Sequence, residues 1–559
     1  MKYNGAELLI KLLEEEGIKE LAGIPGGSNL PIYDALYKSN IKHILTRHEQ
    51  GAGFIAHGMT RSSGKPAVCM ATSGPGATNL LTAIADAKLD SVPIIAITGQ
   101  VPSTYIGTDA FQEVDTYGMS IPITKHNFLI RNIEELLWVI PEAFRIALEG
   151  RPGPVLIDIP KDIQNQTIEI KSLPKRKPRK KTRFEINQSD ISQFKEMLKK
   201  SKRPLIFAGG GIIQSNASEL LQTFARSKHI PVATSLMGIG CMPTDDDLYL
   251  GMIGMHGAKY TNMILAETDL LIAMGVRFGD RSTGNLSKFC PGAKIIHIDI
   301  DHSEIEKIIP ESLSIRACIT DFLSLMEDES IDVDRNAWVS TIQDLKTKYP
   351  LVMPAVEDKL HPINIIKQVA KLTPEDSYIT TDVGQHQMWV AQAYPFKMPK
   401  SFLTSAGLGT MGFGLPTAIG AAIENPHNKI ICFSGDGSIL MNIQELATLA
   451  DLQSNVCIII FNNGQLGLVR QQQEHFFNSR YSASIFTTNP DFAAISKGFG
   501  VKSFRVNQAS ELDIALKEAI SFCGPYVVEI MIKDINNVLP IVPPGAGNHE
   551  MYEGEKNDK

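Results

Sequence analysis

A carboxylate, a pair of amides and a helix start occur together in one stretch of the sequence. An apolar segment, residues 430–433, precedes Asp436, and a helix is predicted to begin just after Ser438. A second apolar segment ends at Asn462 and Asn463. In an open parallel sheet, ligands bind beyond the carboxyl ends of the strands. Oxygen ligands beside a helix N-terminus at that edge suit a hard divalent cation bound to a diphosphate.

Asp436 and the two asparagines also have a plainer explanation, a helix cap and a turn, because Asp and Asn are common in both places. Asp436 alone favours that explanation. The complete pattern is more demanding: Gly-Asp-Gly before a helix, then Asn-Asn after the next apolar strand. It closely resembles the signature of thiamine-diphosphate enzymes. The resemblance implies a Mg²⁺ and diphosphate site made by Asp436, Asn463, the backbone carbonyl of Gln465, Gly437 and Ser438.

The bulk composition is that of an ordinary globular protein. The 559 residues are 43% apolar, and this length predicts several domains. A net charge of −7 gives no electrostatic reason to expect nucleic acid or an anionic membrane as a partner. The seven cysteines lack C-x-x-C spacing, which predicts reduced, mostly buried thiols. We find no targeting segment and no apolar run of membrane-spanning length, so the expected location is the cytoplasm.

Residues 1–165 alternate amphipathic helices with short apolar strands, which predicts a parallel α/β domain. Glu49 follows one predicted strand and begins a helix rich in Ala and Gly. A glutamate in a first helical turn is stabilised by the helix dipole, and spacing alone favours that structural role. Thiamine diphosphate, however, requires a buried carboxylic acid that hydrogen-bonds its aminopyrimidine ring. An apolar pocket raises the pKa of a carboxyl group, which suits such proton sharing.

Further motifs follow in order along the chain, at residues 23–27, 47–50, 72–76, 99–102, 109–113, 125–127 and 151–155. Together they resemble the catalytic subunit of acetohydroxyacid synthase, also called acetolactate synthase, over essentially the whole chain. The resemblance implies that Glu49 is the acid that activates the cofactor. It also places a set of residues near the substrate: Gly27, Phe111, Gln112 and Lys125 at the reacting atoms, and Lys161 at the mouth of the channel. Without the resemblance, both lysines would be interpreted as solvated surface residues.

Residues 166–188 are predicted to be a linker, because 171–183 are basic, contain proline and have almost no apolar side chains. A nucleic-acid site there is less favoured, since no aromatic residues are interleaved. Residues 189–345 read as a second α/β unit in which a strand runs into three glycines at 209–211. The unit is Rossmann-like but lacks the G-x-G-x-x-G fingerprint. From the residues alone, a structural domain and a nucleotide site are equally compatible with this pattern.

The family resemblance favours FAD in this central domain. The residues it implies are Arg151, Gly209, Gly210, Gly211, Leu236, Met255, His256, Gly275, Arg277, Arg281, Asp299 and Asp321. Arg277 and Arg281 suit phosphate contacts, and Asp299 suits a ribose or adenine edge. One departure is Gly279, where many relatives carry Asp. FAD is mainly structural in this family, so no net redox chemistry is inferred.

Residues 358–535 return to alternating strands and helices, with a layout like that of the first domain. The resemblance assigns two further groups: Gly384, Gln385 and His386 at the diphosphate, and Gly409 and Met411 at the pyrimidine and the bend of the cofactor. Met411 could equally be a core methionine. Most relatives carry Trp where this chain has Gln472. A polar side chain there loses apolar contact with the extra methyl of 2-ketobutyrate, worth roughly 1 kcal/mol. Residues 536–559 are predicted to be an arm over the active site or a frayed end.

The predicted fold is therefore α/β with three doubly wound parallel-sheet domains: two thiamine-diphosphate-binding folds flanking a Rossmann-like domain. The resemblance implies decarboxylation of pyruvate and transfer of the two-carbon unit to a second 2-keto acid, giving 2-acetolactate or 2-aceto-2-hydroxybutyrate for branched-chain amino acids. Thiamine diphosphate, Mg²⁺ and FAD are the implied cofactors. A homodimer or dimer of dimers, with a small regulatory subunit, is the implied assembly. Alternatives are a FAD-free fermentative acetolactate synthase, a pyruvate oxidase-like enzyme and a silent cofactor-binding subunit.

Overall fold

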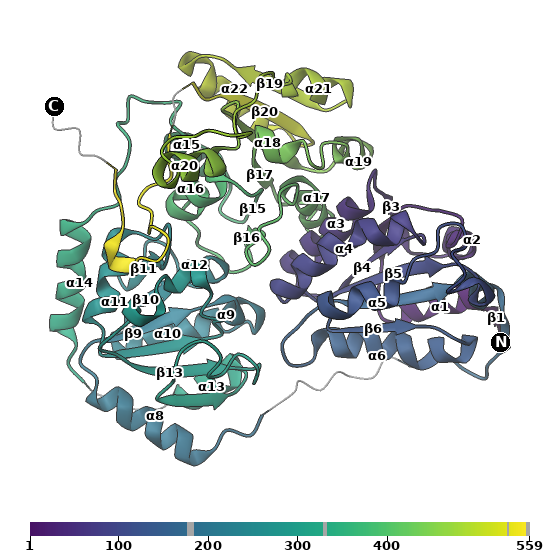
Figure 1. Ribbon diagram of the computed structural model, residues 1–559, viewed down its shortest axis with the longest axis horizontal. Helices are drawn as coiled ribbons and strands as arrows, with labels where there is room; N and C mark the ends of the chain where they lie inside the picture. Colours follow the sequence, from purple (N-terminus) through teal and green to yellow (C-terminus); the bar gives the residue numbers. More distant parts are fainter. Residues whose placement is uncertain (176–183, 328–332, 534–535, 555–559) are drawn as a thin grey trace.

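The computed structural model describes residues 1–175, 184–327, 333–533 and 536–554. Three six-stranded sheets, each entirely parallel, form three α/β units that lie side by side (Figure 1). In that view the first unit lies on the right, the central unit at the lower left and the last unit at the top. The prediction of an α/β protein with three doubly wound parallel sheets is confirmed.

The first sheet has the order β3-β2-β4-β5-β7-β6. Its strands are β2 Glu20–Gly23, β3 Lys42–Leu45, β4 Ala67–Ala71, β5 Ile94–Gln100, β6 His126–Leu129 and β7 Val155–Pro160. Its helices are α1 Gly5–Glu15, α2 Leu30–Tyr37, α3 Glu49–Ser63, α4 Pro75–Leu89, α5 Thr116–Ser120, α6 Leu136–Leu148 and α7 Lys161–Asn165. Alternate residues of β4 face opposite layers: Cys69 packs toward α3 and α4, whereas Val68 and Met70 pack toward α1 and α6. Both faces of the sheet are therefore buried, which explains the runs of apolar residues in these strands.

Two elements of this unit have weak sequence signals. β1 Lys2–Asn4 pairs antiparallel with β8 Thr167–Glu169, so the start of the chain is fixed to the segment that leaves the domain. β6 begins with two polar residues, His126 and Asn127, and forms one edge of the sheet. Neither feature has the apolar run by which the other strands are recognised.

The central sheet has the order β11-β10-β9-β12-β13-β14. Its strands are β9 Pro204–Ala208, β10 Val232–Thr234, β11 Tyr249–Met252, β12 Leu270–Met274, β13 Lys294–Asp299 and β14 Leu313–Arg316. Its helices are α8 Gln188–Lys200, α9 Gly210–Gln214, α10 Ser218–Lys228, α11 Lys259–Glu267, α12 Asp280–Thr283, α13 Ile319–Met326 and α14 Asn336–Lys348. Counted from β9, the order is 3-2-1-4-5-6, the order of dinucleotide-binding folds, whose ligands bind where the winding reverses, here between β9 and β12.

The last sheet has the order β16-β15-β17-β18-β20-β19. Its strands are β15 Tyr378–Thr381, β16 Phe402–Leu403, β17 Ile430–Gly435, β18 Val456–Asn462, β19 Lys502–Val506 and β20 Tyr526–Met531. Its helices are α15 Pro362–Leu372, α16 Gln385–Ala393, α17 Gly414–Glu424, α18 Asp436–Ile439, α19 Glu445–Leu452, α20 Gly467–Phe476, α21 Phe492–Gly498 and α22 Ala509–Ser521. Counted from their own first strands, the first and last parallel sheets both follow 2-1-3-4-6-5. The similar layout expected from the sequence is thus a shared topology.

The first and last units pack directly against each other through α3 and α17. Glycines allow the two helix backbones to approach closely. A Cβ atom on Gly58 would lie 2.0 Å from the carbonyl oxygen of Thr417, and one on Gly420 would lie 2.0 Å from that of Ile55. One buried apolar cluster contains side chains of both units. The two units therefore share a core within the single chain.

Two connecting segments complete the chain. Within the linker predicted at 166–188, residues 176–183 lie outside the described residues, as do 555–559 at the end of the arm. The described part of the arm, 536–554, packs on α20 and on the central unit; Val542 donates its backbone N–H to the carbonyl of Met255 at 2.9 Å. In Figure 1 this segment is the yellow trace beside β11 and α11. Within the described ranges, no helix is both long and apolar enough to cross a membrane.

Candidate active site and flavin groove

The strand register of the last sheet brings Asp436 to the asparagine pair. β17 and β18 are parallel neighbours in which Gly435 pairs with Phe461, so Asp436 and Asn462 follow side by side at the carboxyl edge. The Asp436 side chain is 1% exposed. One of its oxygens accepts hydrogen bonds from the backbone N–H of Gly464 and the amide of Asn489, both at 2.7 Å. Burial raises the pKa of Asp436 to about 6, so a bound cation would stabilise its charged form.

The other predicted metal ligands lie on the loop that follows β18. The side-chain oxygen of Asn463 accepts from the backbone N–H of Gln465 at 3.2 Å. Gln465 is buried and bridges to Ile485, which ties this loop to the segment after α20. Ser438 is also buried, and its hydroxyl accepts from the backbone N–H of Gly435 at 3.1 Å. Gly437, one residue earlier, follows Asp436 on α18. The structure therefore brings this predicted set together at one edge.

Two buried side chains at the start of α16 face the same edge. Gln385 donates its amide to Gln471 at 3.0 Å, but its oxygen has no partner among the described residues. Nε2 of His386 is also without a described partner, and burial lowers the pKa of His386 to about 3, so the ring is neutral. A Cβ atom on Gly384 would lie 2.8 Å from the His386 ring, and one on Gly435 would lie 3.1 Å from it. Glycine thus keeps the ring in contact with the backbone of both turns.

Gly409 and Met411 lie on a loop, residues 405–412, between β16 and α17. Gly409 has φ +66°, a backbone conformation that favours glycine, and a Cβ atom there would meet nothing within 4 Å. Met411 is half-buried. The end of the loop is held by Asp382, which accepts from the N–H of Gly412 at 2.7 Å, and by Asn442, which donates to the carbonyl of Gly412 at 2.7 Å. The backbone at Gly409 is therefore open to a ligand.

Glu49 is the first residue of α3, as the sequence predicts. Its carboxylate accepts from the amide of Asn79, on α4, at 2.9 Å. In the single chain the side chain is half-buried, which differs from the buried acid that the cofactor requires.

A second carboxylate, which the sequence analysis missed, holds the turn before Glu49. Glu445, on α19 of the last unit, is fully buried and accepts from the backbone N–H groups of Arg47 and His48, each at 3.0 Å. The hydroxyl of Thr448 donates to its other oxygen at 2.7 Å. Burial raises the pKa of Glu445, against the effect of these hydrogen bonds. No local pattern marks this contact, because its partners lie about four hundred residues away in the sequence.

Most residues predicted to meet the substrate lie at the same edge of the first sheet as Glu49. Gly27 follows β2, Lys161 begins α7 directly after β7, and Phe111 and Gln112 lie in the long connection after β5. Gln112 has φ +58°, and its backbone lies against Gly74 at the start of α4. Phe111 is 87% exposed. These residues therefore surround the N-termini of α3 and α4, and the apolar side chain of Phe111 faces solvent.

Lys125 does not belong to this group. It directly precedes β6, and because β6 is parallel to β7, Lys125 lies at the amino-terminal edge of the sheet, roughly one strand length or 15–20 Å from the carboxyl edge. Its ammonium group donates to the carbonyls of Ile146 and Glu149 at the end of α6. Burial lowers the pKa of Lys125 to about 8. Lys125 therefore lies at the opposite edge of the first sheet from Glu49, although it lines the groove described below; its place near the reacting substrate stays a prediction.

A groove of about 2340 Å³ lies among the three units. It is lined by all but one of the predicted FAD residues: Arg151, Gly210, Gly211, Leu236, Met255, His256, Gly275, Arg277, Arg281, Asp299 and Asp321. Gly209 lies just beneath, where a Cβ atom would come within 2.0 Å of the carbonyl oxygen of Gly275. The glycines occupy the ends of β9 and β12, where the winding of the central sheet reverses. Gly409 and Gln472 also line the groove, so it extends to the last unit.

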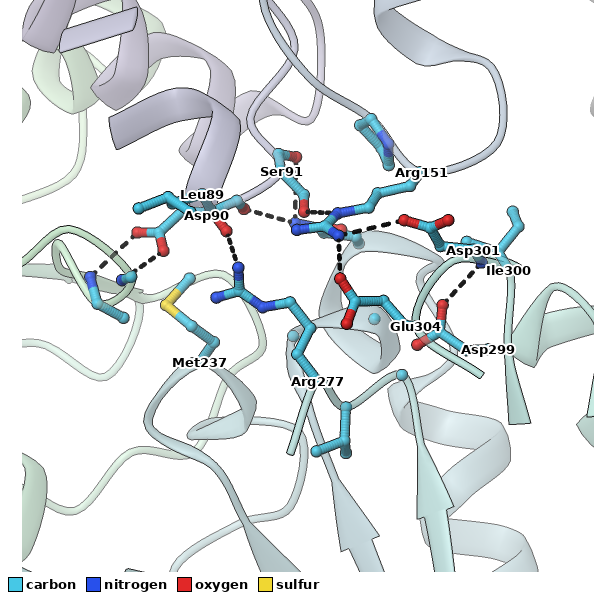
Figure 2. Close-up of a pocket in the computed structure, with 18 of the residues that line it drawn as sticks. Leu89, Asp90, Ser91, Arg151, Met237, Arg277, Asp299, Ile300, Asp301 and Glu304 are labelled. Carbon is cyan, nitrogen blue, oxygen red and sulfur yellow. Dashed lines mark hydrogen bonds and ion pairs between the residues drawn. The ribbon is translucent and has the colours of Figure 1, made fainter. Parts of the chain in front are cut away.

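Figure 2 shows how Arg151 and Arg277 reach into this groove from opposite sides. Arg151 pairs with Glu304 at 2.7 Å and with Asp301 at 3.2 Å. Arg277 donates to the carbonyl oxygen of Leu89. Asp299, at the end of β13, has its pKa raised to about 6 by burial. Two guanidinium groups and a strand-end carboxylate thus line one cavity.

Comparison with known proteins agrees with this geometry. Three family models of thiamine pyrophosphate enzymes match the chain: the N-terminal TPP binding domain at residues 3–119, the central domain at 191–326 and the C-terminal TPP binding domain at 382–530. The acetolactate synthase isozyme 1 large subunit of Escherichia coli (strain K12) is 51% identical over 551 residues, which cover 98% of each chain. The chain belongs to the acetolactate synthase large-subunit family.

Other members of the family are similar over the same length. The isozyme 2 large subunit of Escherichia coli (strain K12) is 42% identical, covering 98% of this chain and 99% of its own. A probable acetolactate synthase large subunit of Methanocaldococcus jannaschii is 47% identical, covering 97% and 94%. The resemblance inferred from the motifs is therefore confirmed, and thiamine diphosphate is the cofactor for which the matched family models are named.

The residues at the edge of the last sheet fit such a cofactor. Nε2 of the neutral His386 ring, which has no partner among the described residues, can donate a hydrogen bond to a diphosphate oxygen. A carboxylate, an amide oxygen and a backbone carbonyl form an oxygen donor set that suits Mg²⁺. Asn489 and Gln471, which the sequence analysis missed, support this set by binding Asp436 and Gln385. Neither could be predicted from spacing, since Asn489 follows the Asn-Asn motif by more than twenty residues.

The groove fits a flavin dinucleotide in shape and charge. A Cβ atom on Gly211 would lie 2.7 Å from Cα of Gly275, so no side chain other than hydrogen fits where the two turns meet. That leaves the backbone accessible to a ligand, as dinucleotide-binding turns require. Arg151 and Arg277 supply positive charge to the groove opposite these glycine turns. Arg281 is largely exposed and lies 3.8 Å from Asp280, so it is free to turn toward a phosphate.

Proposed function

We propose that this chain is the catalytic subunit of an acetolactate synthase that uses thiamine diphosphate, Mg²⁺ and FAD. It would combine two pyruvate molecules into 2-acetolactate and CO₂, as the first common step toward branched-chain amino acids. One observation carries the proposal: the chain is 51% identical to such a large subunit over 98% of its length. Two further observations support the proposal. The residues around Asp436, at the carboxyl edge of the last sheet, are of the types that bind Mg²⁺ and a diphosphate, and Glu49, at the start of α3, is a carboxylic acid of the type that activates thiamine diphosphate.

The proposed roles of the residues follow from their positions. Asp436, Asn463 and the carbonyl of Gln465 would hold Mg²⁺, and through it the diphosphate. When bound, thiamine diphosphate supplies an acidic carbon that adds to the keto group of pyruvate and an electron sink for loss of CO₂. The carboxyl of Glu49 would hold a proton for exchange with the aminopyrimidine. Met411 would support the bend of the cofactor from below.

FAD is proposed for the groove between the three units. The supporting observations are the close-packed glycine turns of β9 and β12 and the arginines at positions 151 and 277. Since the bound nucleotide would contact all three units, its role is to hold them together. The expected observation is a bound flavin with visible absorbance in the purified protein, which a FAD-free acetolactate synthase would lack.

A homodimer is proposed as the smallest active unit. Glu49 is only half-buried and Phe111 is 87% exposed in the single chain, so the described residues cover the predicted catalytic edge only in part. The relatives are called large subunits, and we therefore also propose a small regulatory subunit as a partner. A mixture of Glu49→Gln chains and Asp436→Asn chains, each inactive alone, should recover activity if the site is shared. No recovery from demonstrated mixed dimers would contradict sharing.

The decisive test of the function is a product assay. Purified protein is incubated with pyruvate, Mg²⁺, thiamine diphosphate and FAD, and acetolactate, aldehyde and peroxide are measured separately. Acetolactate is expected; peroxide would instead support a pyruvate oxidase-like enzyme, and no product would support a silent binding subunit. Glu49→Gln should abolish turnover with an unchanged circular dichroism spectrum, and Asp34→Asn, an exposed carboxylate on α2, is the matched control.

Gln472 is proposed to set the choice of the second substrate. It lies on α20, it is exposed to solvent and it lines the groove next to the last unit. With pyruvate and 2-ketobutyrate in competition, the wild type should show little preference for 2-ketobutyrate. Gln472→Trp should raise that preference about fivefold, as roughly 1 kcal/mol of added apolar contact implies. A strong preference in the wild type would contradict the assignment.

A further inference from the structure

Two carboxylates of the first unit, Asp86 on α4 and Asp90 directly after it, are buried against the last unit. Arg61, from α3, lies between them: its guanidinium is 2.7 Å from Asp90 and 3.7 Å from Asp86. His57 lies beside them, with Nδ1 4.0 Å from Asp86, but burial lowers the pKa of this ring to about 3, so it adds no charge. The cluster thus holds two acids and one permanent cation.

Both carboxylates bind the loop that carries Gly409 and Met411. Asp90 accepts from the backbone N–H groups of Ala406 and Gly407, at 3.1 and 2.8 Å. Asp86 accepts from the hydroxyls of Ser405 and of Thr410, the latter at 2.7 Å. The Ser405 hydroxyl accepts in turn from the backbone N–H of Thr410 at 2.9 Å, which closes the loop on itself. Figure 2 shows Asp90 directed toward this loop at the margin of the groove.

The chemistry of the cluster is unusual for a simple contact between domains. Burial and the neighbouring Asp90 raise the pKa of Asp86, whereas Asp90, despite its burial, has its pKa lowered by Arg61 and by the two loop N–H groups. Keeping charge at such a site is costly unless every partner is in place. Apolar side chains would join the two units at a lower cost in desolvation free energy. The partners of the two carboxylates are two backbone N–H groups and two hydroxyl groups of the loop that carries Gly409.

We propose that Asp86 and Asp90 are positioning residues that hold loop 405–412 in the shape required by the pyrimidine half of thiamine diphosphate. Asp90 holds the entry of the loop and Asp86 ties Ser405 to Thr410, so Gly409 is fixed between two anchored points. The diphosphate half is held elsewhere, around Asp436. The inference rests on the proposed cofactor site, but it concerns only one half of the ligand.

That division gives a selective test by titration calorimetry with two ligands. In Asp90→Asn an amide replaces the carboxylate. The amide oxygen can accept from one loop N–H group, but the amide N–H then lies opposite the other loop N–H group, and the two donors repel each other. The substitution should weaken binding of Mg²⁺–thiamine diphosphate about tenfold or more, but change the affinity for Mg²⁺–pyrophosphate by less than about twofold. Near-ultraviolet circular dichroism of the bound cofactor, which responds to the state of its aminopyrimidine, should change as well. An equal loss for both ligands, or no loss for either, overturns the proposal.

Two further variants keep the test decisive. Thr410→Val removes one hydroxyl donor and leaves Asp86, Asp90 and Arg61 intact; it should give a smaller selective loss, about three- to tenfold, even if Asp90→Asn fails to fold. Asp269→Asn is the matched control, because Asp269 likewise accepts from two backbone N–H groups, of Lys202 and Arg203, but in the central unit away from the loop. It should alter neither affinity.

The outcomes also separate this inference from the proposed function. Wild-type protein that binds thiamine diphosphate without making acetolactate would refute the function and leave the positioning role standing. Wild-type protein that makes acetolactate, with Asp90→Asn and Thr410→Val binding both ligands normally, would refute only the positioning role.

Discussion

Replacing Glu445 by alanine should both destabilise the protein and release the turn that presents Glu49. The carboxylate accepts three hydrogen bonds, from the N–H groups of Arg47 and His48 at 3.0 Å and from Thr448 at 2.7 Å. Leaving buried N–H groups without a partner costs about 1–3 kcal/mol each. Removing the buried charge returns part of this cost, since burial raises the pKa of Glu445. We therefore expect a net loss of about 2–4 kcal/mol in the free energy of unfolding.

The assay combines urea unfolding with turnover measured under conditions where the variant remains folded. Glu445→Ala should lower kcat by about tenfold or more, because Glu49 begins the helix that this contact holds. Glu445→Gln keeps one acceptor oxygen and should recover part of both losses. Binding of Mg²⁺–pyrophosphate should be retained, since Asp436 lies on a separate turn.

The chain offers a matched control in Asp451. It is 60% exposed at its side chain and binds the guanidinium of Arg47 at 2.6 Å, from the same helix as Glu445. Exposed ion pairs contribute at most about 1 kcal/mol, so Asp451→Ala should leave stability and turnover nearly unchanged. If Glu445→Ala behaves like Asp451→Ala, the reasoning that links Glu445 to Glu49 is refuted.

Three other substitutions test the geometry. Gly58→Ala should lower the melting temperature and loosen the contact between the first and last units, because its Cβ would lie 2.0 Å from the Thr417 carbonyl; normal thermal unfolding would contradict this. Gly27→Ala should fold normally, since its Cβ would meet nothing within 4 Å; a lower kcat/KM with unchanged melting would place Gly27 at the substrate, and unchanged kcat/KM would remove it from the site. Burial raises the pKa of Asp158 to about 7 from 3.8, so its stabilising protonation is lost as pH rises through 7. Asp158→Asn should therefore flatten the dependence of melting temperature on pH between about 4 and 7; an unchanged profile would contradict the assigned pKa.

The fold was largely predictable because parallel strands buried on both faces leave a plain sequence signal. β4 is an unbroken apolar run, and β5 and β18 each begin with one; such runs are typical of parallel strands buried on both faces. β6 gives a weaker signal, because it begins with the polar residues His126 and Asn127. The position of Lys125 depends on this strand, which Lys125 directly precedes, and is therefore hard to predict from the sequence.

The candidate site could be predicted only where it is built from local motifs. Asp436 and Asn463 follow adjacent strands, and the rule for parallel sheets brings them together. Glu445 and Asp90 carry no such pattern, because each binds backbone groups some three to four hundred residues away. A carboxylate that binds backbone N–H groups needs no particular residue type in its partner. Contacts of that kind become visible only in the folded chain.

The geometry of helix α4 supports the proposal that the active site is shared between two chains. Its first turn lies against Glu49: a Cβ atom on Gly76 would be 3.3 Å from that carboxylate. Toward its other end, Asp86 accepts from the hydroxyl of Thr410, the residue after Gly409. The helix rises 1.5 Å per residue, so Gly76 and Asp86 are about 15 Å apart along it. That separation is too long for direct contact between Glu49 and an aminopyrimidine seated at Gly409 of the same chain, and the proposed role of Glu49 requires such contact. We infer that a second chain supplies the acid, and that each α4 serves two sites at once, one at either end.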